Sequence, residues 1–152
     1  MDTSFWGRLA ETSLLAERKT SYRFLNRSCR GHDILVSPLV LYEVRRNPKP
    51  DVRRQIERRL FDAYRIMVPA SHSARAIAED LQEEGPFSDK MIADLTHVGY
   101  AIVGVADALV TWDARTLARD KVRIAVDAYC RREDRPAPLI GSPEEVAEWL
   151  NL

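Results

Sequence analysis

Cysteine is scarce in this sequence, with two in 152 residues and no C-x-x-C spacing. Cys29 and Cys130 lie in opposite halves of the chain, so the sequence predicts neither a disulfide framework nor a zinc knuckle. We expect both thiols to be reduced and half-buried.

Long apolar runs are also missing. No stretch approaches the roughly 20 residues that span a bilayer, and the amino end lacks the basic-then-apolar order of a signal peptide. The composition, 45% hydrophobic and 30% charged, is typical of a globular protein. We therefore expect a cytoplasmic protein with no membrane partner, folded as a single domain over residues 1–152.

Net charge is zero, but the charges are unevenly distributed. Residues 1–66 hold 14 basic and 8 acidic residues, whereas residues 67–152 hold 9 and 15. This asymmetry has two interpretations, contact with a nucleic acid or a dipolar, well-solvated surface, and charge alone does not choose between them.

Short apolar runs alternate with helical patterns along the chain. Strands are expected at Ile34–Val36, Arg65–Val68, Ala108–Trp112 and 138–140, and helices at 13–29, 38–46, 51–63, 72–84, 88–104, within 114–132, and after Ser142. Such alternation predicts an α/β fold with a mainly parallel sheet covered by helices on both faces. In this architecture ligands bind at the carboxyl ends of the strands.

Four acids stand out when their positions are compared with the predicted strands. Asp113 directly follows a strand, Glu43 lies on a mostly apolar helix that also follows one, and Asp94 lies within a helix. Asp2 opens the chain in the segment MDTSFW. A charge such as that of Glu43, surrounded by apolar neighbours, requires a partner.

Each acid also has a simpler explanation. Asp113 would serve equally as a helix N-cap, and Asp2 as a frayed terminus. Lys90 and Asp94 have the spacing of a surface ion pair, and a lone His97 is more often a packed core histidine than a metal ligand.

Taken together, the acids predict a cation. Two like charges about 4 Å apart repel by around 4 kcal/mol at an effective dielectric near 20. Mg²⁺ or Mn²⁺ would offset this repulsion through oxygen ligands, activate water and stabilise charge on a phosphoryl group. The pattern therefore favours phosphodiester hydrolysis, with the basic half of the chain holding the polyanion.

Several segments resemble one family, the PIN-domain nucleases, and within it the VapC-type toxin ribonucleases of toxin–antitoxin pairs. The matching segments span nearly the whole chain; they are MDTSFW, ILVSPLVLYEVRR, ADLTHVGYAIVGVADALVTWDART and PLIGSPEEV. The resemblance implies a three-layer α/β fold with a central sheet of four to five short strands. It also implies a Mg²⁺- or Mn²⁺-dependent endoribonuclease acting on structured RNA such as tRNA or rRNA, a homodimer, and a cognate antitoxin.

The resemblance also assigns residue roles. Asp2, Glu43, Asp94 and Asp113 match the four acids of the family's site. Asp2, Asp94 and Asp113 would hold the metal directly or through water, and Glu43 would hold or polarise the attacking water.

Neighbouring residues would support these acids. Thr3 and Ser4 would orient the first acid, and Thr111 would brace the fourth by a hydrogen bond. Lys90 and His97 would tune or position Asp94.

Four arginines are the candidate RNA-backbone contacts: Arg45, Arg46, Arg54 and Arg58. Their alternative role is that of a solvated helix face.

The chain departs from the family pattern at its beginning. The family places a full apolar strand, central in the sheet, before the first acid, whereas only Met1 precedes Asp2 here. We expect either a severely shortened strand or a start that has been mis-assigned or trimmed.

The sequence also bears on four other functions. A PIN-like module that binds RNA or protein with little turnover keeps the same fold. A receiver-like phospho-switch fits poorly, because the mid-chain strands run into Ser37 and Pro69 instead of a phosphoacceptor Asp. Serine hydrolase and dinucleotide-binding functions lack the G-x-S-x-G and G-x-G-x-x-G motifs.

Overall fold

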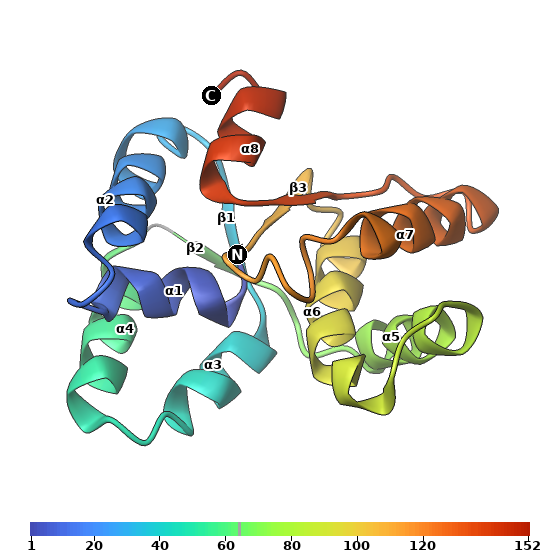
Figure 1. Cartoon of the computed structure of the whole chain (residues 1–152), viewed down its shortest axis with the longest axis horizontal. Coiled ribbons are helices and arrows are strands. Elements are labelled where there is room, and N and C mark those ends of the chain that lie inside the picture. The colour runs from blue at the N-terminus through green and yellow to red at the C-terminus, as the bar shows by residue number, and fades with distance from the viewer. Residues whose placement is uncertain (64) are drawn as a thin grey trace.

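The computed structural model describes residues 1–63 and 65–152. These residues form an α/β fold with eight α-helices, one π-helix, one 3₁₀-helix and four strands (Figure 1). In chain order the elements are α1 (Thr3–Ala10), α2 (Leu15–Arg23), the π-helix η1 (Phe24–Ser28), β1 (Ile34–Val36), α3 (Pro38–Arg45), α4 (Pro50–Asp62), β2 (Arg65–Met67), α5 (His72–Glu84), the 3₁₀-helix η2 (Asp89–Met91), α6 (Ile92–Val103), β3 (Ala108–Val110), α7 (Asp120–Arg132), β4 (Leu139–Gly141) and α8 (Pro143–Trp149).

The four strands form two separate parallel sheets, β1–β2 and β3–β4. The expected single central sheet of four to five strands, with helices in layers on its two faces, is therefore wrong. The physical reason lies at the amino end of the chain. Met1 and Asp2 reach only the end of β3, where the Asp2 N–H donates to the Val110 carbonyl (3.1 Å), so they do not bridge β1 and β3 as a full strand would.

The predicted starts of two helices are confirmed. Ser37 accepts a hydrogen bond from the Val40 N–H at the start of α3, where Pro38 occupies the first turn. At the start of α8, Ser142 and Glu145 form a reciprocal capping box.

Helix α1 was not among the predicted elements. Asp2 is its N-cap and accepts a hydrogen bond from the Phe5 N–H (3.1 Å). Phe5, Trp6 and Leu9 recur at helical spacing and are buried, so α1 is held by its apolar face.

Other boundaries differ from those predicted. The expected helix over 13–29 divides into α2 and η1, and the expected helix over 88–104 divides into η2 and α6. The strand predicted at Ala108–Trp112 ends at Val110, because the Trp112 N–H donates to the Ser4 hydroxyl and leaves the ladder.

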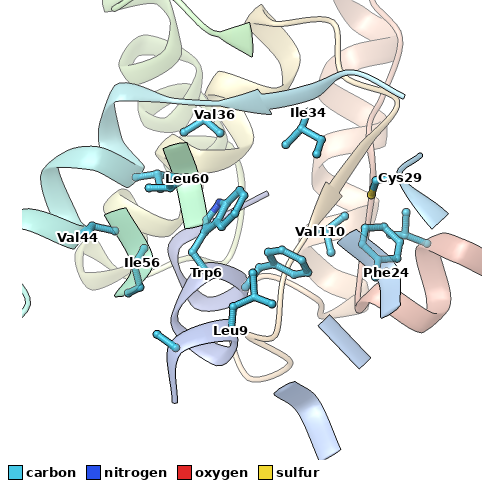
Figure 2. Packing of buried hydrophobic residues seen from close by; sticks show 14 residues of the cluster. Trp6, Leu9, Phe24, Cys29, Ile34, Val36, Val44, Ile56, Leu60 and Val110 are labelled. Carbon is cyan, nitrogen blue, oxygen red and sulfur yellow. The ribbon is translucent and has the colours of Figure 1, made fainter. Parts of the chain in front are cut away.

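The core has two parts. The first joins α1, η1, α3 and α4 with β1 and contains Trp6, which Figure 2 shows among Val36, Ile56 and Leu60. The second joins α5, α6 and α7 with β3 and β4. The cysteines are free, one in each core, and both are buried instead of half-buried as expected.

Among the described residues, no helix combines the length and the apolar character needed to cross a bilayer.

Helices α5 and α6 pack closely at Gly99. A Cβ at this position would lie 2.0 Å from the Ala74 carbonyl oxygen, so the two backbones would have to separate. We predict that Gly99→Ala lowers the free energy of unfolding by roughly 1–3 kcal/mol.

The matched control is Gly7→Ala in α1, where nothing lies within 4 Å of an added Cβ. Alanine favours a helix over glycine, so this variant should gain up to about 1 kcal/mol. Urea denaturation of both variants checks the prediction, and equal stabilities would contradict the close packing at Gly99.

Candidate functional site

Asp2 lies where the amino end of α1 meets the carboxyl end of β3. Only 4% of its surface is exposed, and both oxygens accept hydrogen bonds. Oδ1 accepts from the Ser4 hydroxyl (2.7 Å) and the Phe5 N–H, and Oδ2 accepts from the Thr111 hydroxyl (2.7 Å). Hydrogen bonds from protein groups therefore hold the Asp2 carboxylate in place, and Asp2 is not a frayed terminus.

The two hydroxyls extend this network to the backbone after β3. The Trp112 N–H donates to Ser4 Oγ (2.8 Å), and the Asp113 N–H donates to Thr111 Oγ1 (2.9 Å). Ser4 thus orients Asp2 as expected. Thr111 braces the backbone of Asp113 and also holds Asp2, so it connects the first and fourth acids.

Glu43 on α3 contacts residues from two other helices. Its Oε2 lies 3.0 Å from His97 Nε2 of α6 and accepts a hydrogen bond from the Thr3 hydroxyl of α1. Burial raises the pKa of Glu43, but the hydrogen bonds from His97 and Thr3 and the charge of His97 outweigh it and lower the pKa overall. Thr3 therefore hydrogen-bonds Glu43 and not Asp2 as expected, whereas His97 contacts Glu43 and its charge also acts on Asp94.

Asp94 lies in the first turn of α6 and is half-buried. Burial raises its pKa to about 6, and the charges of Asp113, Glu43 and Asp2 add to the shift while His97 opposes it. Among the described residues, no hydrogen bond or ion pair reaches its carboxylate. Asp94 is therefore a half-buried acid that has no hydrogen-bond or ion-pair partner in the described part of the chain.

Asp113 begins the loop between β3 and α7. Its Oδ1 accepts hydrogen bonds from the Arg115 and Thr116 N–H groups (3.1 and 3.0 Å), so it caps a turn. Asp113 is not the N-cap of the following helix, the simpler explanation of its position, because α7 begins at Asp120 and its N-cap is Arg119. Oδ1 is engaged in the turn, and the charge of Asp113 still acts on Asp94.

The other three acids all lie within electrostatic range of Asp94, since the charges of Asp113, Glu43 and Asp2 each raise its pKa. Within the part of the chain that the structure describes, no three His, Cys, Asp or Glu side chains form a ready-made metal cage. A hydrated Mg²⁺ needs no such cage, because it binds through one or two carboxylates and keeps several waters. The carboxylate oxygens present suit a hard cation.

Lys90 is exposed in η2, outside α6, and no ion pair between described residues joins it to Asp94. The simple explanation of a Lys90–Asp94 surface pair therefore fails, as does the expectation that Lys90 positions this acid.

The candidate arginines are exposed on α3 and α4 and just beyond α3. Arg54 pairs with Asp51, and Arg58 lies 4.0 Å from Asp62. Arg46 donates to the Tyr42 hydroxyl (2.7 Å). Arg45 is without an ion pair to any described residue and is the most available to an external anion.

Ser21 is a positioning residue that sequence reasoning missed. It is fully buried in α2, and its hydroxyl accepts from Trp112 Nε1 (2.8 Å). This bond holds the residue immediately before Asp113. The local signal was weak, because Ser21 lies in a helix whose other residues are mostly polar.

No family model, curated protein or solved structure matches the chain.

The raised pKa of Asp94 makes a prediction about stability. The unfolded chain releases this proton near its ordinary pKa of 3.8 and the folded chain at about 6, so wild-type stability falls as pH rises between these values. Without divalent cations, Asp94→Asn should be more stable than wild type above about pH 6 by roughly 1–2 kcal/mol, and equal to it below about pH 4.

Urea denaturation across this pH range measures the difference, with the exposed Asp107→Asn as the control. A gain that did not change with pH would show that the effect does not come from the carboxylate charge.

Proposed function

We propose that the chain is a Mg²⁺- or Mn²⁺-dependent endoribonuclease that hydrolyses phosphodiester bonds in structured RNA, as the resemblance to VapC-type PIN-domain toxins implies. The observation that carries the proposal is Asp94, a half-buried carboxylate with a raised pKa and no protein partner, facing the charges of three further acids. A cation is the partner that would stabilise such a group.

The surroundings of each acid indicate its role in binding the cation. Both oxygens of Asp94 and Oδ2 of Asp113 have no donor among the described residues, so these two acids would hold the cation directly or through water. Asp2 already accepts three hydrogen bonds, so it would act chiefly through water and charge. The cation would supply a Lewis acid for the phosphodiester and activate water.

Glu43 is suited to orienting water. Its lowered pKa keeps it ionised at neutral pH. Because Thr3 and His97 both bind Oε2, Oε1 remains available to accept a hydrogen bond from water. A carboxylate with a lowered pKa is a weak general base, so Glu43 would accept a hydrogen bond from the attacking water more readily than it would take the proton.

A second candidate function is an RNA- or protein-binding module with little or no turnover. The observation in its favour is that the described residues contain no preformed three-ligand group. The partners proposed with the nuclease function are tRNA or rRNA, a cognate antitoxin and a second copy of the chain.

The nuclease proposal is tested by RNA cleavage with Mg²⁺ and Mn²⁺. Asp94→Asn and Asp113→Asn should each reduce the metal-dependent rate on the order of 100-fold. Asp107→Asn, an exposed acid at the opposite end of β3, is the matched control and should cleave at the wild-type rate.

Circular dichroism and thermal unfolding establish that each variant is folded. Wild type that binds RNA but does not cleave it with either cation would support the binding module. Cleavage by Asp94→Asn at the wild-type rate would contradict the assigned site.

The exposed Arg45 and Arg46 lead to a separate prediction about RNA binding. If Arg45 and Arg46 contact phosphates, replacing both with Ala should weaken RNA binding and reduce the slope of log affinity against log salt by about 2.

The control replaces Arg75 and Arg131, which lie far along the chain on α5 and α7 and pair within those helices with Glu79 and Asp127; it should leave the slope unchanged. Fluorescence anisotropy between low and moderate salt measures both slopes. Equal slopes for all three proteins would indicate that the RNA lies elsewhere.

A further inference from the structure

Two arginines from separate helices converge on one tyrosine, and we call these three residues the Tyr22 cluster. The guanidinium carbon of Arg18, in α2, lies 5.6 Å from the centre of the Tyr22 ring, and that of Arg59, in α4, lies 5.0 Å from it. Helix α1 packs against both α2 and α4 (Figure 1). Tyr22 itself packs against the core around Trp6, so the ring holds the two guanidinium groups near one another.

Neither arginine of the cluster has an acidic partner. Arg18 and Arg59 are both half-buried, and no ion pair between described residues reaches either of them. The Nε atom of Arg18 is buried and has no hydrogen-bond partner in the described part of the chain. Because a charge withdrawn from water is costly without a partner, an anion from outside the chain would stabilise these groups.

Arg132 shows how the chain treats an arginine in a similar position elsewhere. Its guanidinium carbon lies 5.0 Å from the centre of the Tyr129 ring. It also pairs with the carboxylates of Glu84 and Glu133. The charge of Arg132 is therefore matched within the chain, whereas the two charges over Tyr22 are positioned by an aromatic ring and left unmatched by any described acid.

Phosphate is the anion that suits such a pair of groups. A guanidinium is planar, remains charged at physiological pH and donates two parallel hydrogen bonds to phosphate oxygens. A nucleic-acid strand carries a phosphate at every nucleotide, so two neighbouring guanidinium groups bind one phosphate jointly or two in succession. Aromatic rings beside basic groups are also typical of surfaces that bind nucleic-acid strands.

Helix α2 connects the Tyr22 cluster to the acids. Ser21 lies between Arg18 and Tyr22 in this helix, and its hydroxyl accepts a hydrogen bond from Trp112 Nε1 (2.8 Å). Trp112 directly precedes Asp113. The cluster and Asp113 thus belong to one connected part of the molecule, which a polymer such as RNA is long enough to span.

We propose that Arg18 and Arg59, positioned by Tyr22, form a phosphate-binding site for the backbone of the RNA substrate. The site holds RNA away from the bond that is cleaved, so it contributes affinity and takes no part in the chemistry. The proposal rests on the proposed function for the identity of the polyanion, RNA, and not for the cleavage step.

The test measures binding of a fluorescein-labelled RNA hairpin by anisotropy in EDTA, which removes divalent cations and so prevents metal-dependent cleavage. The double variant Arg18→Gln/Arg59→Gln keeps most of each side-chain stem and removes both charges. We expect it to weaken binding at least about tenfold and to reduce the slope of log affinity against log salt by about 1–2. The matched control, Arg75→Gln/Arg132→Gln, removes two charges that carboxylates already match and should bind as wild type does.

Two variants of Tyr22 test whether the ring positions the arginines. Tyr22→Leu keeps an apolar side chain but has no aromatic face, and it should weaken RNA binding by about threefold. Tyr22→Phe keeps the face and should bind as wild type does. Equal affinities for the Leu and Phe variants would overturn the positioning role. Circular dichroism and thermal unfolding establish that every variant is folded.

Unchanged affinity and slope for the glutamine pair would overturn the proposal, as would a wild-type chain that does not bind RNA. A further arm adds a polyglutamate peptide. Peptide binding that requires Arg18 and Arg59, with RNA binding that does not, would assign the site to an acidic protein and overturn the proposal.

These outcomes are distinguishable from failure of the nuclease function. A chain that binds RNA through Arg18 and Arg59 but does not cleave it with Mg²⁺ or Mn²⁺ would support the phosphate site and contradict the nuclease. A chain that cleaves RNA, and whose glutamine pair binds it as tightly as wild type, would support the nuclease and contradict the site.

Discussion

The carboxylate of Asp2 joins parts of the chain that are far apart in sequence. It caps α1 through the Phe5 N–H, and it accepts hydrogen bonds from Ser4 and from Thr111 at the end of β3. Those hydroxyls in turn accept from the backbone N–H groups of Trp112 and Asp113. The placement of α1 against β3, and with it the position of two of the four acids, depends on this buried network.

The same surroundings shift two neighbouring acids in opposite directions. Glu43 has donors in Thr3 and His97, so its pKa is lowered despite burial. Asp94 is comparably buried but has no donor among the residues that the structure describes, so burial and the charges of the other acids raise its pKa to about 6. Pairs of titratable groups driven apart by their environments are characteristic of functional sites, although structural networks also produce them.

Local sequence patterns predicted those features that neighbouring residues determine. Ser37 and Ser142 mark helix starts because each cap acts within three residues of itself. The rule that ligands bind at strand ends singled out Asp113 and Glu43, and in the structure the charges of both act on Asp94. Contacts between distant segments, such as Thr3 with Glu43 and Ser21 with Trp112, depend on tertiary packing and left no local signal. Alternating strands and helices specify parallel direction but not which edges pair, so the single sheet was mispredicted.

Strand β3 belongs to both halves of the interior. Val110 packs in the core around Trp6, whereas Leu109, one residue earlier, packs in the core around α5, α6 and α7. Alternation of side chains along a strand places these two residues on opposite faces. If either half unfolded, β3, which is three residues long, would lose the packing on one of its faces. The halves are thereby thermodynamically coupled, and the chain should lose its structure in one cooperative transition.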